Sequence, residues 1–294
     1  ALGIKPEDIG GTKLGALGIP EFGTDFAMQM LMDTKPQYFS DLVRIAGLAH
    51  GTDVWLGNAQ TLIKEGKATI STAICTRDDI MIYLIQKGLD SEESFKIMEM
   101  VRKGKVASGK CKEWPEWKQD MIDHGVPDWY IWSCERIKYM FPKAHAAAYV
   151  MMAWRVAYCK VFYPLAYYTA YFSIRATAFD YEKMAMSPVR LEHYIAEYKA
   201  KKAEGTISNT EEDELGVMRI VQEMHARGYE FTPIDIYKAK ARTFQIIDGK
   251  IMPSFKVISK VGEVAGESIE IAARDGEFLS KDDLRQRAKI GQSA

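Results

Sequence analysis

The stretch FPKAHAAAYVMMAWRVAYCKVF, residues 141–162, decides the fold of this chain. Pro142 suits the first turn of a helix, and from Ala144 onward no Gly or Pro interrupts a run rich in alanine, methionine and aromatic residues. Such a run predicts a long helix that is apolar on most faces and buried at the centre of the fold. Arg155 and Lys160 lie within it, so a membrane span is rejected.

Capping signals predict further helices on the N-terminal side of this run and beyond it. Thr24 is expected to cap a helix over residues 25–34, and Ser40 is expected to cap the helix that follows. Acidic residues in the first turn of a segment and a glycine near its C-terminal end also predict a helix. On these signals we predict further helical segments over residues 76–89, 90–105, 127–140 and 180–227.

The pattern changes after Gly228. Two β-prone runs joined by Asp248-Gly249 predict a β-hairpin near residues 243–253. The segment VISKVGEVAGESIEIAA (257–273) then predicts two helices with Gly262 in the turn, a helix–hairpin–helix or an ordinary helical hairpin. Backbone N–H groups at such a turn can bind a DNA phosphate without reading sequence. The expected fold is therefore mainly α, with a small β-hairpin and a helix–hairpin–helix element.

Composition and charge exclude several classes of protein. The net charge of -1 over 294 residues argues against a protein that simply coats nucleic acid, so any such role needs local basic patches. Four cysteines without a C-x-x-C pair argue against structural zinc and for a reducing cytoplasm. The start at ALGIKPEDIGG and the stop at AKIGQSA suggest a piece cut from a longer chain.

No complete set of catalytic residues is recognisable in the sequence. A D-x-D pair in a short apolar strand, a G-x-S-x-G elbow and a phosphate-binding P-loop are all missing from it. The sharpest binding feature is FPKAHAAAY, where Lys143 and His145 occupy the first turn of a helix, at the end that favours an anion. Tyr149 lies on the same face, one turn later. These residues could grip a phosphate and stack a base, or they could cap a helix around a buried tyrosine.

Further cations and a loop histidine are weaker candidates. Arg77 opens a predicted helix, and His50 lies in the loop HGTDVW. Ordinary surface charge is the alternative for the arginine, and a hydrogen-bonded loop residue is the alternative for the histidine. Another predicted helix ends in three cations, Arg102, Lys103 and Lys105. The alternative for them is a basic helix end that is simply solvated at the surface.

Taken together and in order, six segments resemble one family, the PolC-type DNA polymerase III alpha subunit of low-GC Gram-positive bacteria. KAHAAAY is shared with the wider bacterial polymerase III alpha family, and HGTDVWLGNAQ is more specific to PolC. The segments are LGIPEFGT (17–24), GLAHGTDVWLGNAQ (47–60), RDDIMIYLIQKGL (77–89), IMEMVRKGK (97–105), YMFPKAHAAAYVMMAWRVAYCKVFYPLAYY (139–168) and DGEFLSKDDLRQR (275–287).

The resemblance implies a part of a replicative DNA polymerase. It implies a fingers domain over residues 1–228 and the start of a duplex-DNA-binding domain over residues 229–294. The family's metal-binding aspartates lie in the palm, so Mg²⁺ would bind outside this chain, no catalytic residue would lie within it, and the chain alone would be inactive. The implied partners are primer–template DNA, the incoming dNTP, the palm and thumb of the longer chain and, through other parts, the sliding clamp, but no membrane.

Matched positions carry the family's binding roles to particular residues. The cations of VRKGK, Arg102, Lys103 and Lys105, fall where the family contacts the incoming triphosphate. Lys143 and His145 fall near the same phosphates, Tyr149 where a ring packs on the incoming base, and Phe141 where guanine-mimic inhibitors act. Arg77 and His50 are assigned to the same nucleotide site. Duplex DNA contacts are assigned to Lys260 and Gly262.

The sequence departs from the family in two places, and two other functions are alternatives to this assignment. The segment VASGKCKEWPEW (106–117) looks longer than is usual, and Lys260 replaces the first glycine of the hairpin. A DNA-repair glycosylase or lyase also uses a helix–hairpin–helix, but it needs a catalytic Asp or Lys just after the hairpin, where none is clear. A non-catalytic helical scaffold would bind neither nucleotide nor DNA.

Overall fold

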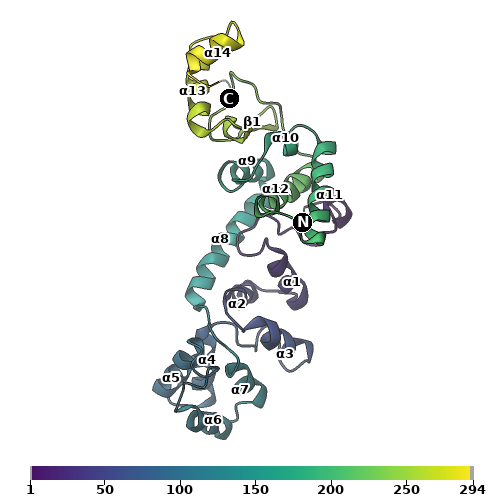
Figure 1. The fold of residues 1–294 in the computed structure, drawn as a ribbon. Coiled ribbons are helices and arrows are strands. Elements are labelled where there is room, and N and C mark those ends of the chain that lie inside the picture. The colour runs from purple at the N-terminus through teal and green to yellow at the C-terminus, as the bar shows by residue number, and fades with distance from the viewer. Residues whose placement is uncertain (1, 292–294) are drawn as a thin grey trace. The chain divides into compact units, whose positions relative to one another are not determined.

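The structure is a computed structural model that describes residues 2–291. It divides into two compact units: the first unit is Ile19–Arg155, and the second unit combines Ala1–Gly18 with Val156–Ala294. Helices dominate both units, and the described residues contain one two-stranded sheet (Figure 1). The expectation of a mainly α fold with a small β-hairpin is confirmed. The boundary expected near residue 228 stays a prediction.

The first unit is built from short helices and the beginning of one long helix. Thr24 caps the first of these helices as expected, because its hydroxyl accepts a hydrogen bond from Ala27 N at 3.2 Å. In order the helices are α1 (Asp25–Thr34), α2 (Phe39–His50), a π-type turn (Trp55–Ala59), α3 (Gln60–Lys64), α4 (Arg77–Lys87), α5 (Ser91–Arg102), α6 (Trp114–Asp123), α7 (Asp128–Cys134) and the start of α8 (Lys143–Phe162).

The structure corrects two helix boundaries. Ser40 does not cap α2; the N-cap is Tyr38, whose N–H donates to the Asp41 carboxylate at 3.0 Å. The helix predicted over residues 127–140 ends at Cys134, because the following segment becomes extended and pairs with Thr52. That extended segment becomes important for the site described below.

The expectation that the long central helix is buried on most faces is wrong. In α8 the side chains of Met151, Met152 and Trp154 are 48%, 47% and 57% exposed, and only one narrow stripe, which includes Ala146 and Val150, is buried. Apolar composition alone cannot fix burial, since burial depends on how many sides of a helix have neighbours. No helix in the described part of the chain is long and apolar enough to cross a membrane.

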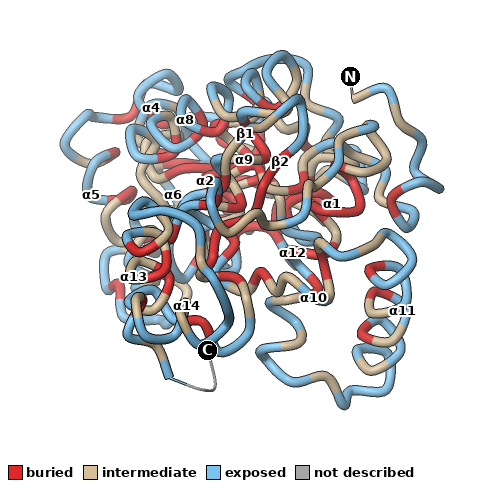
Figure 2. The backbone as a smooth tube through the Cα atoms, turned by 90° about the horizontal axis from the view of Figure 1, so that it is seen from above, coloured by how far each residue is buried: buried red, intermediate tan, exposed pale blue. Residues whose placement is uncertain are grey.

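The second unit pairs long charged helices with a compact C-terminal region. Helix α11 shows the usual pattern, since Leu191, Ile195 and Tyr198 are buried while most of its other residues are exposed (Figure 2). In order the elements are a 3-10 turn (Pro6–Ile9), the end of α8, α9 (Pro164–Ile174), α10 (Tyr181–Met184), α11 (Pro188–Glu204), α12 (Asn209–Ala226), β1 (Gln245–Ile247), β2 (Lys250–Met252), a 3-10 turn (Phe255–Val257), α13 (Glu263–Arg274) and α14 (Lys281–Ala288).

The C-terminal turns follow the sequence signals in part. Asp248 and Gly249 have φ of +50° and +76°, so both central residues of the hairpin adopt the left-handed conformation that such a turn requires. The helix expected before Lys260 is only the three-residue turn Phe255–Val257, while α13 begins after Gly262 as expected. The helix–hairpin–helix as a whole therefore stays a prediction.

Candidate nucleotide-binding site

The extended segment 138–141 of the first unit joins four helices. Thr52, just after α2, donates its N–H to a carbonyl oxygen of this segment at 2.9 Å. The last residue of α5, Arg102, accepts from the segment at 3.3 Å, and Arg77, which begins α4, donates to it at 3.2 Å. The segment itself leads into α8. It therefore brings together the motifs that lie far apart in the sequence.

Two glycines allow backbone segments of the first unit to approach closely, and one of them, Gly104, faces the segment 138–141. Gly104 has φ +68°, and a Cβ added there would lie 2.6 Å from the carbonyl oxygen of Lys138. Gly47 lies one turn before the end of α2, and a Cβ there would lie 2.7 Å from the Cys75 carbonyl oxygen. Real Cβ atoms do not approach so closely, so a larger residue at either position would push the backbones apart.

Four of the predicted nucleotide-binding residues form one aromatic cluster, defined here as His50, Phe141, His145 and Tyr149. The Phe141 ring is central: its centroid lies 4.8 Å from His50, 6.1 Å from His145 and 6.2 Å from Tyr149, with which it is stacked at 26°. Tyr149 is 41% exposed, so the alternative of a buried core tyrosine is contradicted. The cluster can present an aromatic face to a ligand.

Lys143 stands beside this cluster, at the start of α8. Its backbone N–H donates to the Asp78 carboxylate at 2.8 Å, and its ammonium lies 3.6 Å from Asp79. One of the backbone groups that the sequence left free for an anion is therefore already occupied. Arg77 has a buried Nε without a hydrogen-bond partner, since the Asp78 carboxylate is 3.9 Å away. Its guanidinium retains capacity for a further acceptor.

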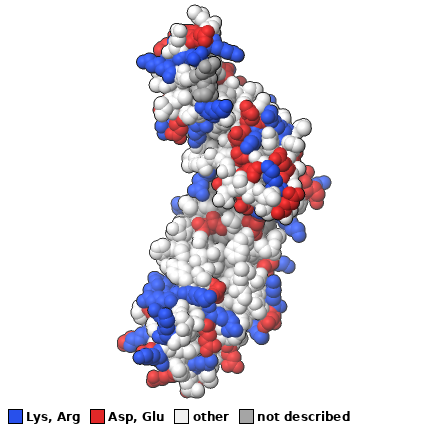
Figure 3. All heavy atoms as spheres, viewed as in Figure 1, with Lys and Arg blue, Asp and Glu red and all other residues white. Residues whose placement is uncertain are grey.

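The cations at the end of α5 are not equally available. Glu99 binds Arg102 through both carboxylate oxygens and lies 2.8 Å from the ammonium of Lys103. These contacts, the hydrogen bond from Arg102 above all, lower the pKa of Glu99 to about 2. Lys105 is exposed and has no ion pair within residues 2–291. Figure 3 shows Lys and Arg side chains gathered over α4 and α5.

Sequence reasoning missed the acidic partners of these cations. Glu99 lies three and four residues before Arg102 and Lys103, a spacing that predicts helical ion pairs and could have found it. Glu21 pairs with His50 across 29 residues, and no local pattern could reveal that contact. Every predicted nucleotide-binding residue nevertheless lies near the segment 138–141 or the first turns of α8.

The predicted DNA-binding residues belong to the second unit. Lys260 is exposed, and its φ of +67° places it in the left-handed region, where a glycine is the usual residue. Gly262 is the exposed N-cap of α13. No group of three or more His, Cys, Asp or Glu side chains within residues 2–291 could hold a metal ion.

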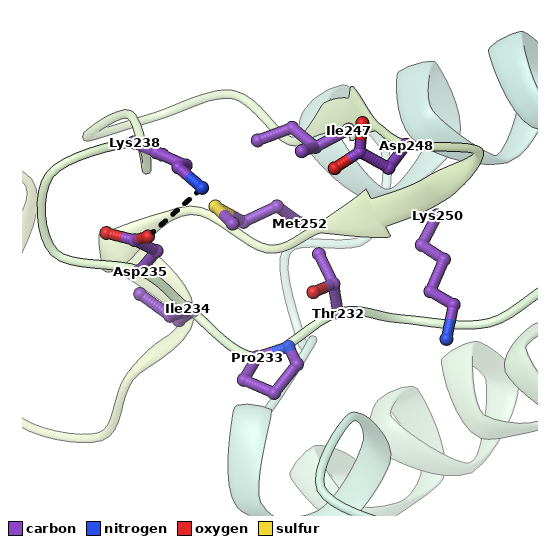
Figure 4. A pocket seen from close by; sticks show the side chains of 9 residues that line it. All are labelled: Thr232, Pro233, Ile234, Asp235, Lys238, Ile247, Asp248, Lys250 and Met252. Atoms are coloured by element: carbon purple, nitrogen blue, oxygen red, sulfur yellow. Dashed lines mark ion pairs between the residues drawn. The ribbon is translucent and has the colours of Figure 1, made fainter.

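A separate hollow lies beside the β-hairpin of the second unit, with a volume of about 580 Å³ (Figure 4). An ion pair between Lys238 and Asp235, 3.5 Å long, lies on its wall. None of the predicted binding residues lines it, and we assign it no function. Its lining consists of Thr232, Pro233, Ile234, Asp235, Lys238, Ile247, Asp248, Lys250 and Met252.

Comparison with known proteins agrees with the motifs. The family model for the bacterial DNA polymerase III alpha subunit finger domain matches residues 12–125. The DNA polymerase III PolC-type of Streptococcus suis (strain 98HAH33) is 51% identical over 98% of this chain, and that of Bacillus subtilis (strain 168) is 49% identical over 100% of it. The same protein of Caldanaerobacter subterraneus subsp. tengcongensis is 47% identical over 100% of it.

In each case the match spans 20% of the relative's length. The identity runs through both units and includes the first unit, where the aromatic cluster and its cations lie. Over the fifth of the relatives' length that it spans, the chain is similar to PolC-type DNA polymerase III proteins at about half of its positions, and its residues 12–125 match the finger domain of the bacterial DNA polymerase III alpha subunit.

Proposed function

We propose that this chain supplies the part of a DNA-directed DNA polymerase that binds the incoming dNTP and the primer–template duplex. One observation carries the proposal for the nucleotide. Rings from the end of α2, from the segment 138–141 and from α8 converge in the aromatic cluster beside several cations. Aromatic faces stack on any base, while cations bind phosphates, so this combination suits a nucleoside triphosphate.

In this proposal Tyr149 and Phe141 contact the base. Lys143, Lys105 and the VRKGK arginine, Arg102, hold the triphosphate and stabilise the negative charge that builds on pyrophosphate when the primer 3′-OH displaces it. Arg102 must then exchange its bonds to Glu99 for bonds to phosphate oxygens. Mg²⁺ is assigned to a palm domain outside this chain, as are contacts with the thumb and the sliding clamp.

The first test concerns the cations. In a polymerase chain that contains this segment, Lys143→Ala is expected to lower kcat/KM for dNTP incorporation about tenfold, because a cation near developing charge stabilises the transition state. Lys67→Ala is the control, since Lys67 is exposed, pairs with Glu65 at 2.7 Å and is not among the predicted binding residues. Steady-state primer extension measures both variants. Equal activity of the two would contradict the proposal.

The second test concerns the duplex. Lys260→Gly is expected to weaken binding of the chain to two unrelated DNA duplexes equally, and to reduce the salt slope of binding by about 1. Glycine suits the φ of +67°, so the loss would come from the charge and not from strain. Lys35→Gly is the matched control, because Lys35 also has positive φ, at +47°. Fluorescence anisotropy across salt concentrations provides the measurement, and a sequence-dependent loss would argue against phosphate contact.

A further inference from the structure

We propose that Glu21 is a positioning residue for the nucleotide base: it holds the His50 ring in place, and His50 in turn supports the aromatic cluster. This inference rests on the proposed function of the cluster. Glu21 belongs to the turn before α1, in the segment LGIPEFGT, and has no part in the predicted set of binding residues. Its position in the fold and its backbone conformation both point to this role.

The backbone of Glu21 is the first observation. Its φ is +70°, in the left-handed region that glycine adopts freely and that a residue with a Cβ adopts only at a cost in free energy. Pro20 precedes it, as in turns whose next position favours glycine. A glutamate held in such a conformation indicates that its side chain has a use that offsets the strain.

The side-chain contact is the second observation. The His50 imidazole hydrogen-bonds through Nε2 to the Glu21 carboxylate, whose side chain is only 16% exposed. Because a carboxylate accepts, Nε2 carries the proton and donates it. The His50 ring then lies 4.8 Å from Phe141 and 6.4 Å from Tyr149.

His50 is 41% exposed and stands at the end of α2, so its neighbours alone leave the ring room to rotate. The carboxylate fixes one orientation of the ring, at the edge of the aromatic cluster. Loss of Glu21 should therefore disorder the surface on which the base stacks, while the cations that bind the triphosphate remain. The expected result is weaker nucleotide binding with little change in the chemical step.

The experiment uses a polymerase chain that contains this segment and measures dGTP and dATP incorporation. Glu21→Gly is expected to raise KM about fivefold with kcat nearly unchanged, the size of a modest coupling between two sites. Its melting temperature should be equal or higher, since glycine relieves the strain at φ +70°. A merely structural role predicts the opposite, a loss of stability with unchanged KM.

Two further variants, Glu21→Gln and Lys35→Gly, serve as controls, and Tyr149→Ala serves as the reference for loss of the nucleotide site. Glu21→Gln keeps an acceptor oxygen and the same backbone strain, so its KM is expected to rise only about twofold, as a weakened hydrogen bond would give. Lys35→Gly relieves similar strain at φ +47° without a link to the cluster, and its KM should not change.

Tyr149→Ala is measured in parallel. If it raises KM while Glu21→Gly and Glu21→Gln do not, the role of Glu21 is overturned and the nucleotide site stands. If none of these variants changes KM, the proposed nucleotide site itself is wrong.

Discussion

Replacing Lys160 by alanine is expected to lower the free energy of unfolding by about 3–5 kcal/mol, the cost of leaving a buried charge without its partner. The Lys160 ammonium lies 2.7 Å from the Glu223 carboxylate, and the two side chains are 1% and 0% exposed. It also donates to the carbonyl oxygens of Gly15 and Leu17 at 2.9 and 2.6 Å. The substitution removes all of these bonds within the second unit.

The neighbours of Glu223 cannot replace the lost cation. Tyr168 donates to the same carboxylate at 2.7 Å, and the second carboxylate oxygen is buried without a partner. Arg227 donates to the Lys160 carbonyl and to the Tyr168 hydroxyl, not to Glu223. A variant with alanine at position 160 would therefore hold a carboxylate in the core without a cation paired to it.

The pair itself is expected to contribute little net stability. Burial lowers the pKa of Lys160 although a carboxylate is in contact with it, so desolvation outweighs the attraction. A lysine pKa lowered by folding means that the charge costs stability at neutral pH, and the cost disappears as the pH rises through the lowered pKa to the unfolded value. The double variant Lys160→Met with Glu223→Leu should therefore be much more stable than Lys160→Ala.

Urea denaturation of the chain measures these differences. Lys202→Ala is the matched control, because Lys202 also pairs with a glutamate, Glu212, at 2.6 Å, but both side chains are about half exposed. Its loss should stay below about 1 kcal/mol, as is usual for surface ion pairs. If Lys160→Ala lost no more stability than Lys202→Ala, the expected cost of leaving the buried Glu223 carboxylate without its cation would be refuted.

Tyr149→Ala is expected to raise the apparent KM for dNTP in a polymerase chain that contains this segment about tenfold or more. Base stacking on an aromatic ring contributes about 1–3 kcal/mol, and every base has a π-face, so all four nucleotides should be affected alike. Tyr149→Phe should be mild, since the ring stays stacked against Phe141, 6.2 Å away. Steady-state incorporation of each dNTP gives KM and kcat.

Stability separates this expectation from a packing role. Tyr149 is 41% exposed, so its truncation leaves no large cavity and should lower the melting temperature only slightly. Trp154, on the same helix and 57% exposed, offers a control of similar chemistry outside the aromatic cluster. A destabilised Tyr149→Ala polymerase with normal KM would refute the stacking role, as would an equal effect of Trp154→Ala.

Much of the local structure follows from the sequence. The capping residue Thr24 and the turn at Asp248-Gly249 act through atoms only a few residues away, so their geometry is local. The sequence motifs also indicated the family, and the comparison with known proteins agrees with them. Long amphipathic and capped segments are predictable because hydrogen bonds within one turn decide them.

Contacts across long stretches of chain were decided only by the tertiary structure. The helix expected to continue past Cys134 ends there because segment 138–141 pairs with Thr52, more than eighty residues earlier in the chain. The exposure of α8 likewise depends on which of its sides have neighbours. Local propensity carries no information about either.

The same division holds for the candidate site. The sequence by itself supplied His50 and Tyr149 as candidates, each with an ordinary alternative, and the family resemblance added Phe141. Only the fold placed their rings within 4.8–6.4 Å of one another and gave His50 its partner Glu21. It likewise buried Lys160, which in the sequence was only a charge that argued against a membrane span. Pairing and burial depend on residues distant in the chain, and no local pattern encodes which of them will meet.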